Sequence, residues 1–257
     1  MPRNSDKAAE LRAIPITGIG EILPGDSVAD AIATALRRHN LKLMPGDILV
    51  VKHKIVSKAE ARMVVLDRVQ PSPAARRWAA RRKLDARVVQ LALAEARRIV
   101  RQKHGVLITE TSHGLVCANS GVDVSNVDGG RCAVLLPADP DRSAREIHRA
   151  LKKRMRVSVP VLISDSFGRP WREGLCETAI GVAGMKPFRD FRRQRDPHGY
   201  RLRASLEAVA DELACVAGLV CGKLSRSPAC IIRGFRYEAG GGRARQLIRP
   251  KTRDLFR

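Results

Sequence analysis

Apolar positions recur at helical intervals in two parts of the chain. Val28, Ile32 and Leu36 repeat every four residues behind Ser27, a residue type that commonly caps helix N-termini. A second series steps by three and four residues along one face before Gly222: Leu206, Val209, Leu213, Val216 and Val220. The spacing predicts an amphipathic helix over about 28–39 and a long helix that Gly222 closes.

The stretch between these two segments mixes strand and helix patterns. Residues 73–103 predict two helices divided near Asp85, and Ser143 with Glu146 forms a capping box that predicts a basic helix to about Met155. Continuous apolar runs predict short buried strands at 48–51, 106–108, 133–136, 159–163 and 229–232. Because these elements lack a strict βαβ rhythm, the pattern predicts an α+β (mixed α/β) fold. The chain contains neither GxxxxGK[ST] nor GxGxxG, so it is not a P-loop or Rossmann protein.

Length and composition bound the organisation of the chain. The 257 residues, 44 % of them apolar, are enough for a sizeable core in one large domain or two small ones. No apolar run reaches the ~20 residues of a membrane span, and residues 1–12 lack a secretory signal, so we expect a cytoplasmic protein. The glycine- and arginine-rich stretch 240–257 predicts a basic tail that is partly flexible.

Charge narrows the classes of partner. The chain carries 48 Lys and Arg against 26 Asp and Glu, a net charge of +22. This excess predicts an anionic partner such as nucleic acid, a membrane surface or a nucleotide. Basic residues are spread along the chain, and only 4 % of residues are aromatic, so stacking platforms for single strands are scarce and nucleic acid is not favoured. A non-catalytic, basic nucleic-acid-binding protein stays as an alternative from another class.

Two segments offer oxygen ligands for a hard cation. In 121–126 (GVDVSN), Asp123 and Asn126 lie among small residues and glycines that permit tight backbone, which fits either a cation site or a plain Asx-turn. In 164–174, Asp165 and Ser166 directly follow a predicted buried strand, a common position for ligand-binding groups. Two arginines behind them carry planar forks that suit phosphate or carboxylate oxygens: Arg169 and Arg172.

A third segment, 52–60 (KHKIVSKAE), packs three lysines and a histidine behind another predicted strand. Lys58 would serve as a point charge on a nucleotide phosphate, although a solvated basic loop explains the same residues equally well. Composition and spacing alone therefore predict a protein that binds a metal and something phosphorylated.

The same three segments, in this order, resemble the coenzyme F420-0:L-glutamate ligase (gamma-glutamyl ligase) family over about residues 18–234. Each motif is modest by itself, and together they are highly specific. They are GIGEI at 18–22 with PGD at 24–26, GDILVV at 46–51, IVSKAE at 55–60, NSGVDVSNV at 119–127, SDSFGRPWR at 164–172, AIGVAG at 179–184 and AVADELA at 208–214.

The resemblance implies a GTP-dependent ligase. Such enzymes join the amino group of L-glutamate to a carboxylate of a deazaflavin coenzyme precursor and extend the product by a γ-linked glutamate. The resemblance also implies Mg²⁺ or Mn²⁺, with K⁺ as a further cation, and a homodimer of two-domain subunits. For this chain we therefore expect a single ligase unit over 1–257, built of two closely associated subdomains.

The resemblance assigns roles only to those residues of this chain that match the family's motifs. Asp123, Asp165 and Ser166 fall at metal positions. The residues at GTP positions are Ile19, Gly20, Glu21, Ile22, His53, Lys54, Lys58 and Asn126. His53 and Lys54 stand where family members can carry small hydroxylic residues, and 222–228 has fewer glycines than the family's nucleotide loop can have. For the chemistry we expect Asp123, Asp165 and Lys58, together with Arg169 and Arg172 on phosphate. The nearer alternative is an enzyme of this fold that joins an amino acid to a different acid.

Overall fold

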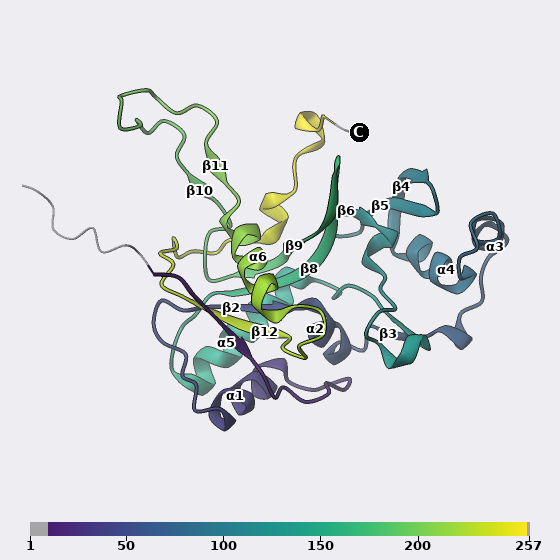
Figure 1. The fold of residues 1–257 in the computed structure, drawn as a ribbon, viewed down its shortest axis with the longest axis horizontal. Coiled ribbons are helices and arrows are strands. Elements are labelled where there is room, and N and C mark those ends of the chain that lie inside the picture. The colour runs from purple at the N-terminus through teal and green to yellow at the C-terminus, as the bar shows by residue number, and fades with distance from the viewer. Residues whose placement is uncertain (1–9, 256–257) are drawn as a thin grey trace, which may run out of the picture.

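The computed structural model describes residues 10–255, and within them the centre of the fold is a five-stranded mixed sheet in the order β1-β12-β2-β8-β9 (Figure 1). Only the β2–β8 pair is parallel; the other neighbours are antiparallel. The strand bounds are Arg12–Ile16 for β1, Ile48–Lys52 for β2, Val161–Arg169 for β8, Arg172–Ala183 for β9 and Ala229–Arg233 for β12.

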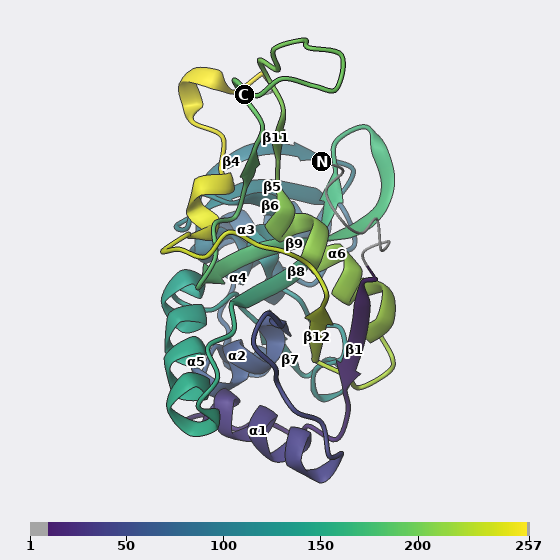
Figure 2. The ribbon, with the colours of Figure 1, turned by 90° about the vertical axis from the view of Figure 1, so that its left-hand side faces the viewer.

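Helices cover both faces of this sheet, because its strands alternate apolar side chains to either side. Leu49 and Val51 of β2 pack into one core with α1 (Val28–Arg38), α2 (His53–Ala59) and α5 (Pro140–Met155). Ile48 and Val50 pack into a second core with α6 (Val209–Cys221). Figure 2 shows α5 and α6 on opposite sides of the sheet.

Residues 63–135 form a separate cluster of elements with its own core, centred on Leu66, Val89 and Leu107. It contains two helices, the antiparallel pair β3-β7 and the antiparallel sheet β4-β5-β6. Its bounds are Pro73–Ala80 for α3, Ala86–Glu95 for α4, Met63–Val65 for β3, Ala96–Lys103 for β4, Val106–Thr111 for β5, Val116–Ala118 for β6 and Cys132–Val134 for β7.

A long two-stranded arm leaves the body between the central sheet and α6 (Figure 1). Its base is the short antiparallel pair β10 (Arg189–Asp190) and β11 (Leu206–Glu207). Beyond α6 and β12, the chain carries 3-10 turns at Ala244–Leu247 and Lys251–Arg253. Ala244 is buried, and its amide donates to Asp141 of α5, so this part of the basic tail packs on the body. Residues 256–257 lie outside the described residues, and flexibility of the tail stays a prediction.

The predicted α+β class is confirmed, but four local predictions need correction. Residues 96–103 form strand β4 and not the end of a helix, since they pair with β5. The basic helix α5 begins at Pro140, with Asp139 as its cap in place of Ser143. Strand β8 continues through Arg169, and α6 begins at Val209, after the separate strand β11.

Two expectations about the whole chain have different outcomes. Within residues 10–255, no helix has the length and apolar character needed to cross a bilayer. The division into two subdomains stays a prediction, although the separate core around Leu66 is compatible with it.

Candidate functional site

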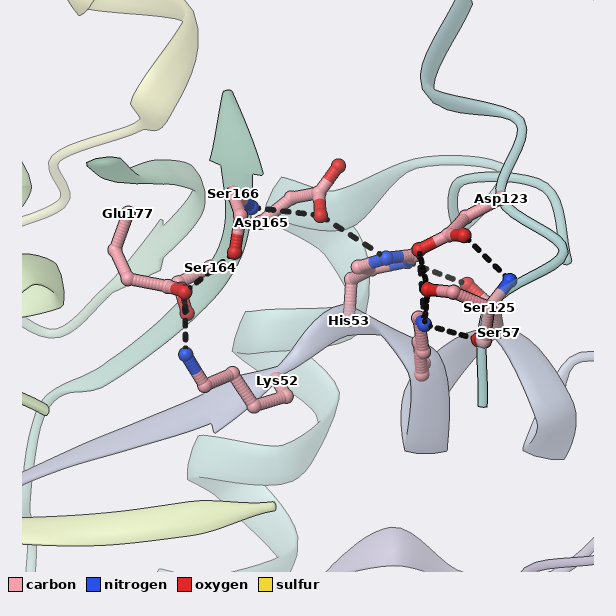
Figure 3. Close-up of polar contacts among 10 residues, drawn as sticks. Lys52, His53, Ser57, Asp123, Ser125, Ser164, Asp165, Ser166 and Glu177 are labelled. Atoms are coloured by element: carbon pink, nitrogen blue, oxygen red, sulfur yellow. Dashed lines mark hydrogen bonds and ion pairs between the residues drawn. The ribbon is translucent and has the colours of Figure 1, made fainter. Parts of the chain in front are cut away.

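Strand β2 ends opposite Ser164 of the parallel strand β8, and polar side chains collect there (Figure 3). Strand β2 ends at Lys52, and helix α2 starts at the next residue, His53. The basic segment 52–60, for which a solvated loop was one of two interpretations, is therefore largely a helix whose first turn faces β8. This arrangement places three consecutive residues, 52–54, against three different carboxylates.

Asp123 is held in this region by Lys54 and by its own loop. Its backbone exchanges hydrogen bonds with Val134 at 2.8 and 3.0 Å. Its carboxylate accepts from the amide of Ser125 at 2.7 Å and from the hydroxyl of Ser125 at 3.0 Å, while Lys54 Nζ lies 2.9 Å from Oδ2. Partial burial alone would raise the pKa of Asp123, but the hydrogen bonds from Lys54 and Ser125 outweigh it, and the net pKa is lowered. The carboxylate of Asp123 is therefore ionised at neutral pH.

Asp165 meets the buried ring of His53. His53 is only 2 % exposed; its Nε2 lies 3.2 Å from Asp165 Oδ1, and its Nδ1 lies 3.3 Å from the hydroxyl of Ser57. The amide of Ser166 also donates to Asp165 Oδ1 at 2.7 Å. The ring therefore fills the space next to this carboxylate, without a hydrogen bond from Nε2. Contact of His53 with a nucleotide stays a prediction, and its observed contacts are those of a support for Asp165.

The side chain of Ser166 points to the other face of β8, as expected for the neighbour of Asp165 in a strand. It donates to Glu177 Oε1 on β9 at 2.7 Å. Ser164 donates to the second oxygen of Glu177 at 2.8 Å, and Lys52 Nζ lies 2.6 Å from Oε1 (Figure 3). Asp165 and Ser166 are thus neighbours in β8 but reach different partners.

Sequence reasoning missed Glu177, and it gave Lys52, a member of the basic segment 52–60, no role of its own. Nothing in the local sequence around Glu177 (LCETAIG) distinguishes it from a surface strand residue. Lys52 had a usable signal: it continues the alternation of Ile48 and Val50, so its side chain had to enter the face covered by α6.

Contacts between distant segments bring together other residues predicted to bind nucleotide. Lys58, at the end of α2, forms an ion pair with Glu21 in the loop 19–22. The amide nitrogen of Asn126 donates to the carbonyl of Lys223 at 3.2 Å, so the 222–228 loop also reaches this region. The loop holding Ile19, Gly20, Glu21 and Ile22 therefore lies against the basic helix that carries Lys54 and Lys58.

Arg169 and Arg172 lie further out, at the turn of the β8–β9 hairpin. Arg169 Nη2 donates to the carbonyl of Glu173 at 2.7 Å, a contact within the hairpin itself. Their distance along the strand from Asp165 separates them from the carboxylate cluster, and a role on phosphate stays a prediction for both.

The donor set suits a hard divalent cation. Residues 10–255 contain no group of three or more His, Cys, Asp or Glu side chains arranged to hold a metal ion. Mg²⁺ bound to nucleotide phosphates, however, commonly takes only one or two protein carboxylates, with phosphate and water oxygens completing its shell. The carboxylates of Asp123 and Asp165 are oxygen donors of that kind and fit such an ion. The hydroxyl of Ser166 donates to Glu177 on the other face of β8, so a place for Ser166 in the metal shell stays a prediction.

Fold and site together define an α+β protein that gathers carboxylates, hydroxyls and lysines where β2 ends beside the parallel strand β8. The chain belongs to the F420-0:Gamma-glutamyl ligase family, whose model matches residues 18–234. This membership confirms the resemblance seen in the sequence.

Proteins called coenzyme F420:L-glutamate ligase are similar to it over most of its length. The protein of Methanopyrus kandleri is 42 % identical over 252 residues, which are 96 % of this chain and 98 % of that protein. The protein of Methanothermobacter thermautotrophicus is 42 % identical over 248 residues, 95 % and 98 % of the two chains. That of Methanocaldococcus jannaschii is 43 % identical over 213 residues, 82 % and 85 % of the two chains.

Proposed function

We propose that this protein ligates L-glutamate to the carboxylate of coenzyme F420-0, with GTP as the energy source and an amide as the product. The observation that carries the proposal is the 42 % identity with ligases of this name across nearly the whole of both chains. Extension of the product by a further γ-linked glutamate, a homodimeric assembly and a cytoplasmic location belong to the same proposal.

The chemistry follows from the poor electrophilicity of a carboxylate. Transfer of the γ-phosphoryl group of GTP to the acceptor carboxylate gives an acyl phosphate and GDP. The amine of glutamate then attacks the acyl carbon, the amide bond forms, and inorganic phosphate leaves with the acyl C–O bond pair. No covalent bond to the protein is needed, so the residues of the chain bind, orient and neutralise charge.

Asp123, Asp165 and Ser166 would hold Mg²⁺ or Mn²⁺, which neutralises charge on the transferred phosphoryl group; K⁺ is a further proposed cation. Lys58 would release Glu21 and contact a phosphate, since a phosphate carries more negative charge than one exposed carboxylate. His53 packs against Asp165. Arg169 and Arg172 would approach phosphate from the β8–β9 hairpin, and Asn126 and Lys54 would contact the nucleotide.

The test is an acceptor-dependent GTP assay. Protein, GTP, L-glutamate and F420-0 with Mg²⁺ or Mn²⁺ should release GDP and phosphate, and the mass of the acceptor should rise by one or more glutamyl residues. Omission of glutamate or of the acceptor should abolish amide formation. An acceptor of unchanged mass, under conditions where GTP binds, would exclude F420-0 as the substrate. A panel of other carboxylic acids then separates this proposal from a ligase of the same fold with another acceptor.

A further inference from the structure

The arm between β10 and β11 contributes nothing to either core. No residue in the range 190–207 is buried, although its backbone is well ordered by hydrogen bonds. Phe191 and Arg193 donate backbone amides across the arm to Ser205 and Leu202 at 3.0 and 2.8 Å. At its tip, Asp196 Oδ1 accepts from the amides of His198 and Tyr200 at 2.9 and 2.8 Å. An exposed segment with this much internal order needs an explanation other than packing.

The base of the arm is fixed to the body. The guanidinium of Arg189 lies 4.9 Å from the centre of the Phe235 ring, and its Nη2 donates to the carbonyl of Arg236 at 2.9 Å. Figures 1 and 2 both show the arm projecting from this base, beyond the end of α6. The arm is therefore an exposed segment whose base is held on the body by contacts of Arg189.

The arm carries a cavity of about 690 Å³ that is open to solvent and lined chiefly by exposed arginines. Arg192 is already neutralised by Asp190, whose carboxylate accepts from its Nε and Nη2 at 2.8 and 2.6 Å. The other lining residues are Arg193, Arg201, Leu202 and Arg203. Of these three arginines, Arg193 lies close enough to Asp190 for its charge to act on that carboxylate, while Arg201 and Arg203 have no acidic partner among the described residues. Four arginines against the single carboxylate of Asp190 leave the cavity with a net positive charge, which favours an anion.

The geometry points to this cavity as a binding site for an oligoanion that carries several carboxylates, the γ-glutamyl chain of the ligation product. This inference rests on the proposed function. Each γ-linked glutamate adds one free α-carboxylate, so the product becomes an oligocarboxylate with a charge at every residue. Planar guanidinium forks match carboxylates geometrically, and three of them match a chain better than a single ion. The arm would hold the chain outside the reaction centre and keep the acceptor bound between additions.

Direct binding tests this site without turnover. The full-length protein is titrated into a fluorescently labelled γ-glutamyl tripeptide, and anisotropy is recorded at low and at physiological salt. The test variant is Arg193→Ala/Arg201→Ala/Arg203→Ala, and the matched control removes three exposed arginines outside the cavity: Arg77→Ala/Arg81→Ala/Arg101→Ala. We expect the test variant to bind about tenfold more weakly, as three solvated charge pairs are lost, and the control to bind within about twofold of the native protein. A triple Arg→Lys variant at the same positions keeps the charge and should recover part of the affinity.

Three outcomes would overturn the inference: no binding of the tripeptide by the native protein, equal weakening in both alanine variants, or binding of single-stranded RNA in place of the peptide through the same arginines. In the ligase assay, the arm variant should raise KM for a glutamylated acceptor and leave KM for GTP and kcat unchanged. If the native protein shows no ligase activity, the proposed function fails by itself. Loss of peptide binding in the arm variant would still establish the anion site.

Discussion

The ammonium group of Lys54 lies 2.9 Å from Oδ2 of Asp123 and 2.6 Å from the carbonyl oxygen of Ser125. Carboxylate, carbonyl and hydroxyl oxygens of this kind are what a hard cation selects, and here a lysine of the chain itself contacts them. A divalent ion that binds Asp123 must therefore displace the Lys54 ammonium or share the carboxylate with it. The positive charge of Lys54 therefore neutralises the carboxylate of Asp123 when no metal ion is bound.

Replacement of Lys54 by methionine should increase the affinity for Mn²⁺ in the absence of nucleotide. The change removes a positive charge next to Asp123 and keeps the length of the side chain. We expect about tenfold tighter binding, or ~1.4 kcal/mol, measured by calorimetry or by the signal of free Mn²⁺ in electron paramagnetic resonance. Lys42→Met, an exposed lysine outside the site, is the control. Equal Mn²⁺ affinity in the two variants would show that Lys54 does not compete with the ion.

Asp165→Asn should abolish ligation while the fold persists. Asparagine keeps an oxygen that accepts from the Ser166 amide but lacks the negative charge that faces His53 and that the proposed cation requires. We expect turnover to fall by at least about 100-fold, with the melting temperature within a few degrees of the native value. Acceptor-dependent release of phosphate and thermal unfolding measure the two effects. Asp67→Asn changes a carboxylate that is 84 % exposed and should be silent in both. An active Asp165→Asn protein would remove Asp165 from the cation site.

The elements that local pattern predicts best are those whose apolar face is set by near neighbours in sequence. The series from Val28 to Leu36 gives α1 to within a residue or two, and the apolar run at 48–51 gives β2. The helix prediction for residues 96–103 was wrong because the sequence ARRIVRQK does not alternate apolar and polar residues as a strand would. Its strand conformation is decided by pairing with β5. The intrinsic strand propensities of the residues carry no information about which distant strand they will pair with.

The site shows the same division between local and distant information. Asp123 and Asp165 were identifiable from their own segments, since each follows a pattern that commonly binds ligands. Their contacts with α2 were not, because these depend on the fold presenting Lys54 to Asp123 and His53 to Asp165. Glu177 became visible only through the antiparallel register of β8 with β9, which places it opposite Ser166.

The thiol of Cys117 reports on the surroundings of Asp165 and should resist alkylation. Burial, and secondly the negative charge of Asp165, raise the pKa of Cys117 to about 12. At pH 9, about one molecule in a thousand carries the reactive thiolate there, whereas an ordinary exposed cysteine is mostly ionised. Cys117 thus binds its proton more tightly in the folded protein than in the unfolded chain. The contribution of this difference to the free energy of unfolding is complete below the unfolded pKa, and it is lost as the pH rises through the folded pKa.

Iodoacetamide labelling at pH 9 followed by mass spectrometry should modify Cys176, which is only half-buried, well before Cys117. Asp165→Asn should speed the labelling of Cys117 only slightly, because burial is the larger cause of its raised pKa. Rapid labelling of Cys117 in the native protein would contradict its placement beneath the site.

Gly218→Ala should destabilise the protein even though alanine is the better helix former. In an open helix interior the change would gain roughly 1 kcal/mol. A Cβ at Gly218 would lie 2.5 Å from Cγ of Glu177. That side chain cannot move aside, because its carboxylate is held by Lys52, Ser164 and Ser166. We expect a net loss of about 1–3 kcal/mol in the free energy of unfolding, measured by denaturant titration.

The matched background is Glu177→Ala, which removes the obstructing atoms. There Gly218→Ala should be neutral or stabilising, so the two substitutions together should be far from additive. An equal cost in both backgrounds would mean that the helix, and not Glu177, sets the requirement for glycine.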